Sequence, residues 1–269
     1  KQRVLTDRNG KKWICTIDAS LYGPDATGKT DCTDALQRAI DDCKRAGGGS
    51  VYLPAGRYAL YKPLRIRTSV MLHGAGEEGS PEEKTVLCCY YGRGDTDGMQ
   101  IAMEACTGLI GVAIYHPEQD VEAPVPYPPA VRQCGSNSIT VERVLFANPW
   151  IGIQCGPDAN ELHFIKNVKI SPLFQGIFMD MTTDIGRMQH LSISPVWYQR
   201  FLGEEPESCR LREDGASGEP VPVEEGGGSA AAGENGDDEF WPARKASACA
   251  RFMLARATGI YMARSDWEY

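Results

Sequence analysis

Three acidic residues in the middle of the chain are candidates for catalytic carboxylates: Glu161, Asp180 and Asp184. Glycoside hydrolysis requires two carboxyl groups about 5 to 9.5 Å apart, one kept protonated and one kept ionised. Neighbouring coils of a stacked repeat could supply such a pair, because their outward side chains line a common groove. The alternative is structural, since Asp180 and Asp184 follow an expected strand, where aspartate often caps a turn.

Two further acidic residues lie at the end of the sequence, where Asp266 and Glu268 flank Trp267. Residues two positions apart share one face of a strand, so this arrangement would set two carboxylates beside an aromatic ring suited to stacking on a sugar. Other side chains that follow the expected strands are candidates for substrate binding: Trp150, Arg187, Trp197 and Tyr198. The aromatic members of this group could equally pack beneath loops.

Polysaccharide lyase chemistry would need a cluster of acidic oxygens to hold calcium, and an arginine or lysine base near a uronate. Arg187 and Lys166 could act as that base, but no cluster of carboxylates accompanies them in the sequence. The ten cysteines include no C-x-x-C pair that would indicate a zinc site. We therefore expect no metal or other cofactor.

Residues 23–30 fit the G-x-x-x-x-G-K-S/T pattern of nucleotide-binding P-loops. A P-loop points successive backbone N–H groups at phosphates, whereas Pro24 has no N–H and Asp25 brings a negative charge into the cradle. The better interpretation is a loop that leads into a helix capped by Asp31 or Thr33. The buried face of this helix is expected to comprise Ala35, Leu36, Ala39, Ile40 and Cys43.

A repeat of short apolar patterns determines the expected architecture. One pattern has an apolar residue, two others, an apolar residue, one other and a final apolar residue, and its starts are 32, 24 and 23 residues apart. These starts are Leu109, Val141, Ile165 and Met188. A second pattern, Gly-Ile-x followed by Cys or Met, begins at Gly152, Gly176 and Gly259. Both patterns are short and alternating, so they predict the strands of stacked coils.

The repeat predicts an all-β fold, a right-handed parallel β-helix whose coils stack about 4.8 Å apart. A leucine-rich repeat is the main structural alternative, but that family needs Asn or Cys where this chain has Pro149, Leu173 and Val196. The N-terminal helix would cover the first coil, which would otherwise expose apolar side chains and an unpaired strand edge.

The N-terminal region also carries a set of short motifs. They are Asp18-Ala19, Tyr22-Gly23, Gly28-Lys29-Thr30-Asp31, Ala35-Leu36-Gln37 and the run from Gly48 to Tyr58. Together they resemble the opening of pectate lyase superfamily domains, which include rhamnogalacturonase- and epimerase-like proteins and relatives of glycosyl hydrolase family 28. The resemblance implies a carbohydrate-active protein, a glycoside hydrolase or polysaccharide lyase that acts on a plant or microbial polysaccharide. The alternative is a non-catalytic glycan-binding or structural module, similar to a tailspike.

The chain is expected to comprise three segments. Residues 1–202 form the cap and coils, 203–245 form a flexible insertion rich in Gly, Glu and Ala, and 246–269 form a short helix and a resumed coil. The sequence stops within that last coil, so we expect the open end to be covered by further coils or by a second copy in a homo-oligomer.

The family resemblance implies a polysaccharide or oligosaccharide as the partner. The formal net charge of −8 argues against nucleic acid and slightly favours neutral glycans. No stretch is apolar enough to cross a membrane. Most cysteines lie among apolar neighbours and are expected to be buried free thiols. The family resemblance favours an extracellular protein, whereas unpaired cysteines are also compatible with the cytoplasm.

Overall fold

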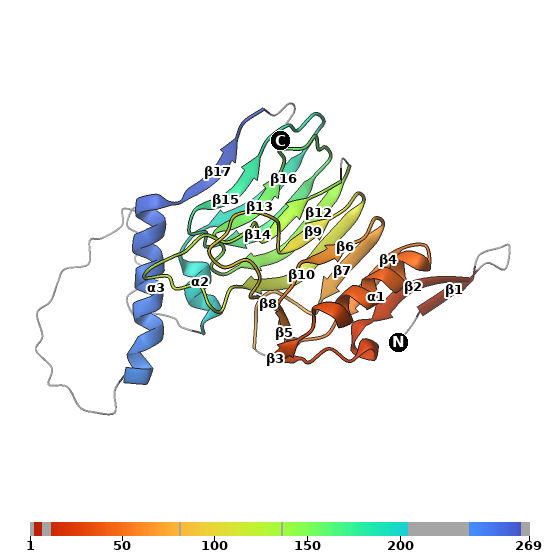
Figure 1. Cartoon of the computed structure of the whole chain (residues 1–269), viewed down its shortest axis with the longest axis horizontal. Helices are drawn as coiled ribbons and strands as arrows, with labels where there is room; N and C mark the ends of the chain where they lie inside the picture. Colours follow the sequence, from red (N-terminus) through yellow and green to blue (C-terminus); the bar gives the residue numbers. More distant parts are fainter. Residues whose placement is uncertain (1–2, 7–11, 81, 136, 204–236, 265–269) are drawn as a thin grey trace, which may run out of the picture.

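The computed structural model describes residues 3–6, 12–80, 82–135, 137–203 and 237–264 of the chain. Figure 1 shows a solenoid of stacked strands that begins beside helix α1 and continues to β17, with α2 and α3 at the side nearer its C-terminal end. The expected right-handed parallel β-helix with an N-terminal capping helix is confirmed. None of the helices within the described ranges has the length and apolar character needed to span a bilayer.

Sheet A is the larger of the two sheets and has eleven strands, of which only β1 and β2 pair antiparallel. Its main path follows the order β1-β2-β4-β7-β10-β12-β14-β16, and β3, β5 and β8 form a side path that joins at β10. The strands are β1 (Arg3–Thr6), β2 (Lys12–Asp18), β3 (Thr27–Asp31), β4 (Gly49–Leu53), β5 (Gly56–Leu60), β7 (Val70–Gly74), β8 (Thr85–Cys89), β10 (Thr107–Tyr115), β12 (Ile139–Phe146), β14 (Phe164–Ile170) and β16 (Arg187–Ile193).

Sheet B has six parallel strands in the order β17-β15-β13-β11-β9-β6. From β9 onward the chain alternates between the sheets, so each coil contributes one long strand to sheet A and one short strand to sheet B. The strands of sheet B are β6 (Leu64–Ile66), β9 (Ile101–Met103), β11 (Val131–Gln133), β13 (Ile151–Cys155), β15 (Gln175–Met179) and β17 (Thr258–Met262).

Each long strand of sheet A turns a corner at one residue with left-handed backbone geometry. The corner residues Gly111, Arg143, Asn167 and His190 have φ values of 64°, 51°, 52° and 53° and occupy equivalent positions in the register. The corner adds one residue between two inward positions and so interrupts the alternation of a strand. This explains the repeat pattern, in which two residues precede the second apolar position and one precedes the third.

Inward side chains form columns that run through the solenoid. One column of sheet A contains Ile17, Val51, Leu72, Leu109, Val141, Ile165 and Met188. All of these except Met188 are at most 2% exposed. Each coil therefore buries its apolar side chains against the coils on either side of it. Six cysteines are buried, as expected: Cys32, Cys43, Cys88, Cys89, Cys155 and Cys249.

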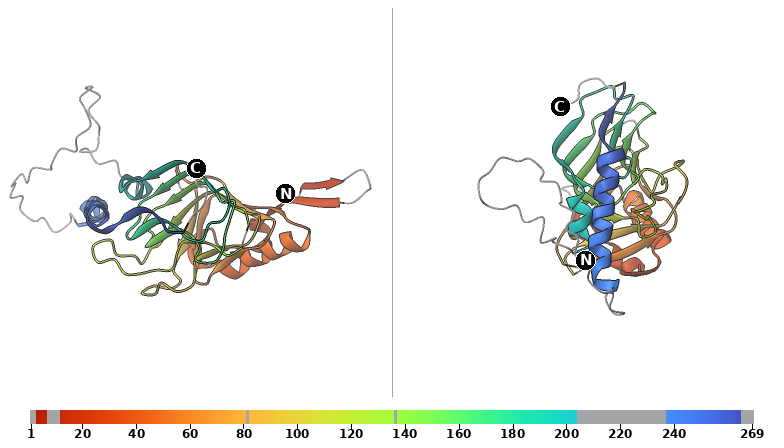
Figure 2. Two further views of the ribbon diagram at one scale, coloured as in Figure 1. Left: turned by 90° about the horizontal axis from the view of Figure 1, so that it is seen from above. Right: turned by 90° about the vertical axis from the view of Figure 1, so that its left-hand side faces the viewer.

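A second apolar core lies on the outer side of sheet A. Leu145 of β12 packs there with Tyr198 and Phe201 of α2 (Val196–Phe201) and Cys249 of α3 (Asp237–Arg256). Figure 2 shows α3 crossing the side of the solenoid and α2 beside it. The described part of the last segment thus contains the expected helix, which begins at Asp237 rather than near residue 246.

In the P-loop-like turn of residues 23–30, backbone N–H groups bind the carboxylate of Asp25. The backbone N–H groups of Thr27, Lys29 and Thr30 donate to the Asp25 carboxylate over 2.9, 3.2 and 3.0 Å. Hydrogen bonds from the side chain and backbone of Thr27, and then from those of Thr30, hold the pKa of Asp25 well below its usual range. The carboxylate thus takes the donors that a phosphate would need, which supports the interpretation of this segment as a structural loop.

Helix α1 (Thr33–Arg45) covers the first coil and supplies hydrogen bonds to its strand edge. The buried side chains of Leu36, Ala39, Ile40 and Cys43 face the core, as expected. The Gln37 side chain pairs with the backbone of Arg65 in β6: its Oε1 accepts from the Arg65 N–H at 2.9 Å, and its Nε2 donates to the Arg65 carbonyl at 3.1 Å. The amide therefore replaces the neighbouring strand that the first strand of sheet B lacks.

Replacing Gln37 with Leu should lower the free energy of unfolding by about 1–2 kcal/mol, because it removes both hydrogen-bond partners of the Arg65 backbone. Urea unfolding followed by circular dichroism measures the loss. Arg38→Leu on the exposed side of α1 is the matched control. A loss for Gln37→Leu no larger than that for the control would contradict the role of this side chain in capping.

Candidate functional site

One column of side chains points outward from sheet B, at the middle position of its three-residue strands and the fourth position of its five-residue strands. We call it the outer column, and its members are Arg65, Ala102, Arg132, Gln154, Phe178 and Tyr261. The residues on either side of each member face inward, because successive side chains of a strand alternate between its faces. Since the strands are spaced about 4.8 Å apart, the outer column runs along the solenoid. Ala102 is only 1% exposed, so the exposed surface of the column is interrupted between Arg65 and Arg132.

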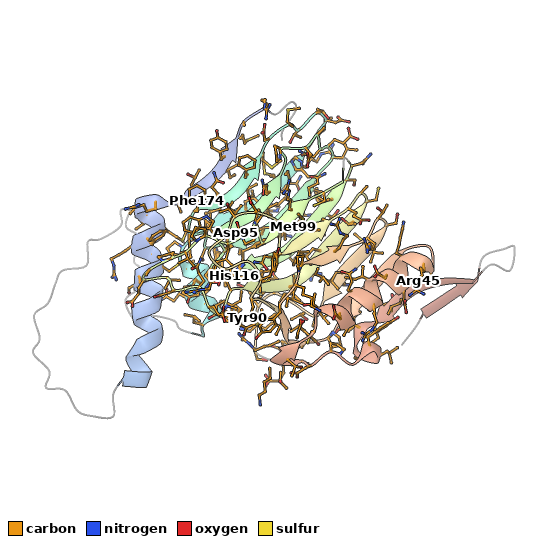
Figure 3. All side chains as sticks on the ribbon, in the orientation of Figure 1. Arg45, Tyr90, Asp95, Met99, His116 and Phe174 are labelled. Atoms are coloured by element: carbon orange, nitrogen blue, oxygen red, sulfur yellow. The ribbon has the colours of Figure 1, made fainter. Side chains whose placement is uncertain are left out.

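Aromatic rings occupy the C-terminal part of this surface. The rings of Phe178 and Tyr261 stack with centroids 5.6 Å apart and planes 9° from parallel. At the edge of the sheet, Trp150 and Phe174 form a second stacked pair at 5.1 Å and 11°, and Phe174 is 40% exposed (Figure 3). Within each pair the two rings cover part of each other's faces, so Phe174 and Tyr261, which are 40% and 47% exposed, are the rings most open to the apolar face of a sugar.

Arginines occupy the N-terminal part of the outer column. Arg65 lies 3.7 Å from the Glu104 carboxylate, and Arg132 lies 3.6 Å from Asp158, whose side chain is 87% exposed. Both distances exceed those of a good charge-assisted hydrogen bond. The two guanidinium groups are therefore weakly held, and they can turn toward an anionic group bound on the outer surface.

Asp180 follows β15 directly and forms a two-point ion pair with Arg264. Arg264 Nε donates to Asp180 Oδ1 at 2.9 Å, and Arg264 NH2 donates to Oδ2 at 2.6 Å. Hydrogen bonds from the Arg264 side chain lower the pKa of Asp180 below its ordinary value. The group is therefore held as a carboxylate, and the general acid of a hydrolytic pair would have to be another residue.

Glu161 and Asp184 lie on neighbouring loops that follow sheet B. A parallel bridge between Asn160 and Thr182 brings these loops side by side. Asp184 Oδ1 accepts a hydrogen bond from the N–H of the adjacent Ile185 at 2.7 Å, which is the geometry of the turn-capping alternative. The remaining candidates Asp266, Trp267 and Glu268 lie outside the described residues.

The structure distributes the candidate binding residues over different faces. Trp150 lies at the edge of sheet B, as described above, whereas Arg187 is exposed on β16 of sheet A. Trp197 lies on α2 and its Nε1 donates to Ser192 Oγ at 2.9 Å. Tyr198 is fully buried in the second core, which favours the alternative that this ring packs beneath other elements.

The arginines and aromatic rings of the outer column were not among the residues expected from the sequence. Phe178 and Tyr261 occupy the variable position of the Gly-Ile-x-Met pattern, between two inward apolar residues. That position must face outward in a strand, so the repeat itself contained the signal for these two rings. Arg65 and Arg132 carry no such signal, because their strands, β6 and β11, are only three residues long and lack the glycine of the pattern.

The chain is similar to several polysaccharide-related proteins. A family model described as rhamnogalacturonase A/epimerase, pectate lyase-like, matches residues 17–89. Over 62 residues the chain is 47% identical to alginate lyase 7 of Azotobacter vinelandii, and this match covers 20% of this chain and 7% of the lyase. It is 39% identical over 62 residues to a probable rhamnogalacturonase A of Aspergillus oryzae, with 23% of this chain and 13% of that protein covered.

The fold is also similar to that of the A-module of the mannuronan C-5 epimerase AlgE6 from Azotobacter vinelandii. The TM-score is 0.51 and the identity is 18%, over 66% of this chain and 50% of the module. The chain thus spans half of that module, and its matches to the alginate lyase and the rhamnogalacturonase are confined to 62 residues of those proteins.

The Asp180–Arg264 pair predicts a pH-dependent effect on stability. Because the pKa of Asp180 is lowered in the folded state, the pair stabilises the fold above about pH 4 and loses this effect as the pH falls through the folded-state pKa. Asp180→Asn should lower the melting temperature at pH 7, and this effect should shrink as the pH is lowered from about 4 through the folded-state pKa of Asp180. Thermal unfolding across this range measures the difference, with the exposed Asp158→Asn as control. An effect of Asp180→Asn that does not change with pH would contradict the prediction.

Proposed function

The chain belongs to the pectate lyase-like superfamily of parallel β-helix proteins, and on this premise we propose that it acts on an acidic polysaccharide bound along the outer column of sheet B. The observation that carries the proposal is the alignment, in one outward column, of arginines that make only long contacts to carboxylates with stacked aromatic rings. Arginine recognises the planar carboxylate of a uronate, and aromatic rings recognise the apolar face of a sugar.

The positive charges of the two arginines on this surface favour uronate-containing chains over neutral glycans. Arg65 and Arg132 lie two strands apart in the outer column, a separation of roughly 10 Å. Binding of two uronates at these positions would replace weak contacts to Glu104 and the exposed Asp158 with charge-assisted hydrogen bonds. The formal net charge of −8 opposes a polyanion at long range, but salt screens that repulsion beyond about 8 Å.

The proposed chemistry uses the loops that border the outer column. Asp180, held ionised by Arg264, is the candidate for the carboxylate partner in glycoside hydrolysis, and Glu161 on the preceding loop is the candidate for the acid. Asp184 is an alternative acid on the same loop as Asp180. For a lyase, the same surface would hold the uronate, and the base would be drawn from the basic side chains that line it. Alginate lyase 7 and the probable rhamnogalacturonase A, named above, support the general substrate class.

Turnover of acidic polysaccharides tests the proposal directly. The chain is mixed separately with alginate, polygalacturonate and the neutral glycan dextran, and both reducing ends and the absorbance of unsaturated products are followed. We expect activity on at least one polyuronate and none on dextran, and unsaturated products identify a lyase. Activity on dextran alone, or on no glycan, would overturn the proposal for this chain.

Arg132→Ala should weaken binding of the processed polyuronate by roughly tenfold or more, because it removes a charge-assisted hydrogen bond. Affinity electrophoresis in gels that contain the polysaccharide measures the change. The exposed Arg38→Ala on α1 removes the same charge away from the outer column. Equal loss in the two variants would mean that net charge, and not this position, governs binding.

Tyr261→Ala should weaken binding of the same polysaccharide by roughly three- to tenfold through the loss of a stacking surface. Tyr261 is 47% exposed, so its removal should leave the inward columns intact. Tyr61 is a matched control, since it is 49% exposed and also stacks on a neighbouring ring, that of Tyr90. The same affinity assay should show no change for Tyr61→Ala, and unchanged binding by Tyr261→Ala would argue against an aromatic platform on sheet B.

A further inference from the structure

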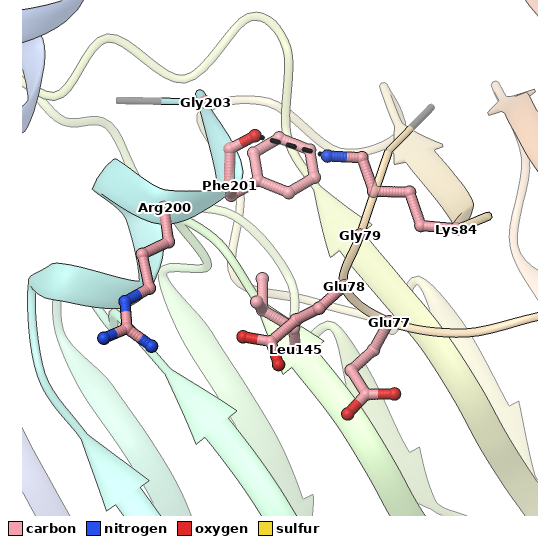
Figure 4. A pocket seen from close by; sticks show the side chains of 8 residues that line it. All are labelled: Glu77, Glu78, Gly79, Lys84, Leu145, Arg200, Phe201 and Gly203. Atoms are coloured by element: carbon pink, nitrogen blue, oxygen red, sulfur yellow. Dashed lines mark hydrogen bonds between the residues drawn. The ribbon is translucent and has the colours of Figure 1, made fainter. Parts of the chain in front are cut away.

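A cavity of about 310 Å³ lies on the outer side of sheet A, away from the outer column of sheet B. One wall is formed by the loop between β7 and β8, the other by the end of α2, and Leu145 of β12 also lines it. Figure 4 shows Lys84 and Phe201 meeting at one side of the cavity, and Glu77 and Glu78 at another. The volume is at the lower end of that of small-molecule sites.

Cationic side chains gather around the ring of Phe201. Lys84 Nζ lies 4.8 Å and Arg57 Cζ lies 5.9 Å from the ring centroid, and Lys84 Nζ also donates to the Phe201 carbonyl at 3.5 Å. Arg200, the adjacent residue of α2, lines the same cavity. None of the ion pairs found among the described residues involves Lys84, Arg57 or Arg200.

Burial of two of these cations costs free energy. Lys84 and Arg57 are both partly buried, and burial together with the neighbouring Arg57 lowers the pKa of Lys84. Partly buried charges without a counter-charge raise the free energy of the folded state. An anionic group placed beside Lys84 would offset that cost.

The opposite side of the cavity offers hydrogen-bond acceptors. Lys169 Nζ lies 3.5 Å from Glu77 Oε1 and also contacts the Glu78 carboxylate, so one cation serves both acids. The carboxylate oxygens that Lys169 leaves free can accept hydrogen bonds from hydroxyl groups. The side chains of Phe201 and Leu145 supply apolar surface between the cationic and the acidic sides.

We propose that this cavity binds a uronic acid monosaccharide. Its carboxylate would contact Lys84, the apolar face of its ring would pack on Phe201, and its hydroxyl groups would donate to Glu77 and Glu78. Arg200, on another side of the cavity, would attract the anion at longer range. The choice of an acidic sugar rests on the proposed function, whereas the anion site itself rests on the uncompensated cations. The cavity and the outer column of sheet B are thus two separate sites for related chemistry.

Isothermal titration calorimetry of the full chain with sodium galacturonate tests this inference. Methyl galactoside, which lacks the carboxylate, and acetate, which lacks the hydroxyl groups, are the matched ligands. We expect galacturonate to bind at least tenfold more tightly than either. Lys84→Met should weaken galacturonate binding by roughly tenfold or more, Arg200→Ala should weaken it by a smaller factor, and Arg38→Ala should leave it unchanged. Arg200 is exposed, so its variant remains informative if Lys84→Met fails to fold.

Three outcomes would overturn the inference: no measurable binding of galacturonate, equal binding of methyl galactoside or acetate, and unchanged galacturonate binding in both folded cavity variants. Arg132→Ala separates this site from the outer column of sheet B, because it should retain galacturonate binding while losing affinity for the polymer. Galacturonate binding that is lost in Arg132→Ala but kept in the cavity variants would place the monosaccharide on sheet B. Loss of polymer activity alone would bear only on the proposed function.

Discussion

Every coil of this protein depends on the alignment of its inward side chains with those of the next coil. A single coil has no interior of its own, so its apolar residues are buried only when equivalent residues lie above and below them. The column from Ile17 to Met188 shows this alignment through seven strands of sheet A. A slip of one residue would turn inward side chains outward, and the shared left-handed corner at Gly111, Arg143, Asn167 and His190 keeps the bend in the same place in each coil.

The same alignment determines where recognition can occur. Outward residues at equivalent positions are brought to one surface at the spacing of the strands, whatever their separation in sequence. Inward positions must remain apolar, so the outward positions are the ones free to vary. Arg132 and Tyr261 both occupy such outward positions, and the residues on either side of each of them face inward. A surface of mixed charge and aromatic character is thus compatible with an unbroken core.

The inner architecture could be predicted from the sequence, whereas most partners of the outward residues could not. The inward columns appear in the sequence as a local, repeating pattern of apolar residues, and α1 appears as an amphipathic helical pattern. By contrast, Asp180 and Arg264 are 84 residues apart, and Lys84 and Phe201 are 117 apart. No local pattern indicates which loop will meet which coil at such separations. For the same reason the sequence presented Tyr198 as a candidate for sugar binding, although α2 and α3 bury it.

Total charge is a poor guide to the ligands of such a solenoid. The chain carries a formal net charge of −8, yet cationic side chains gather at one place on its surface. Lys84 and Arg57 lie against the ring of Phe201 in α2, and Lys84 and Arg200 line the same cavity. None of the three has a carboxylate partner among the described residues. A ligand carboxylate in contact with Lys84 would interact with this cation more strongly than with acids that lie beyond a Debye length of about 8 Å, and the nearer Glu77 and Glu78 share the cation of Lys169. Because Lys84 is partly buried beside Arg57 and its Nζ donates to the Phe201 carbonyl of α2, an anion that binds Lys84 would also stabilise the packing of α2 on sheet A. Ligand affinity and the docking of α2 on the solenoid are therefore expected to be linked.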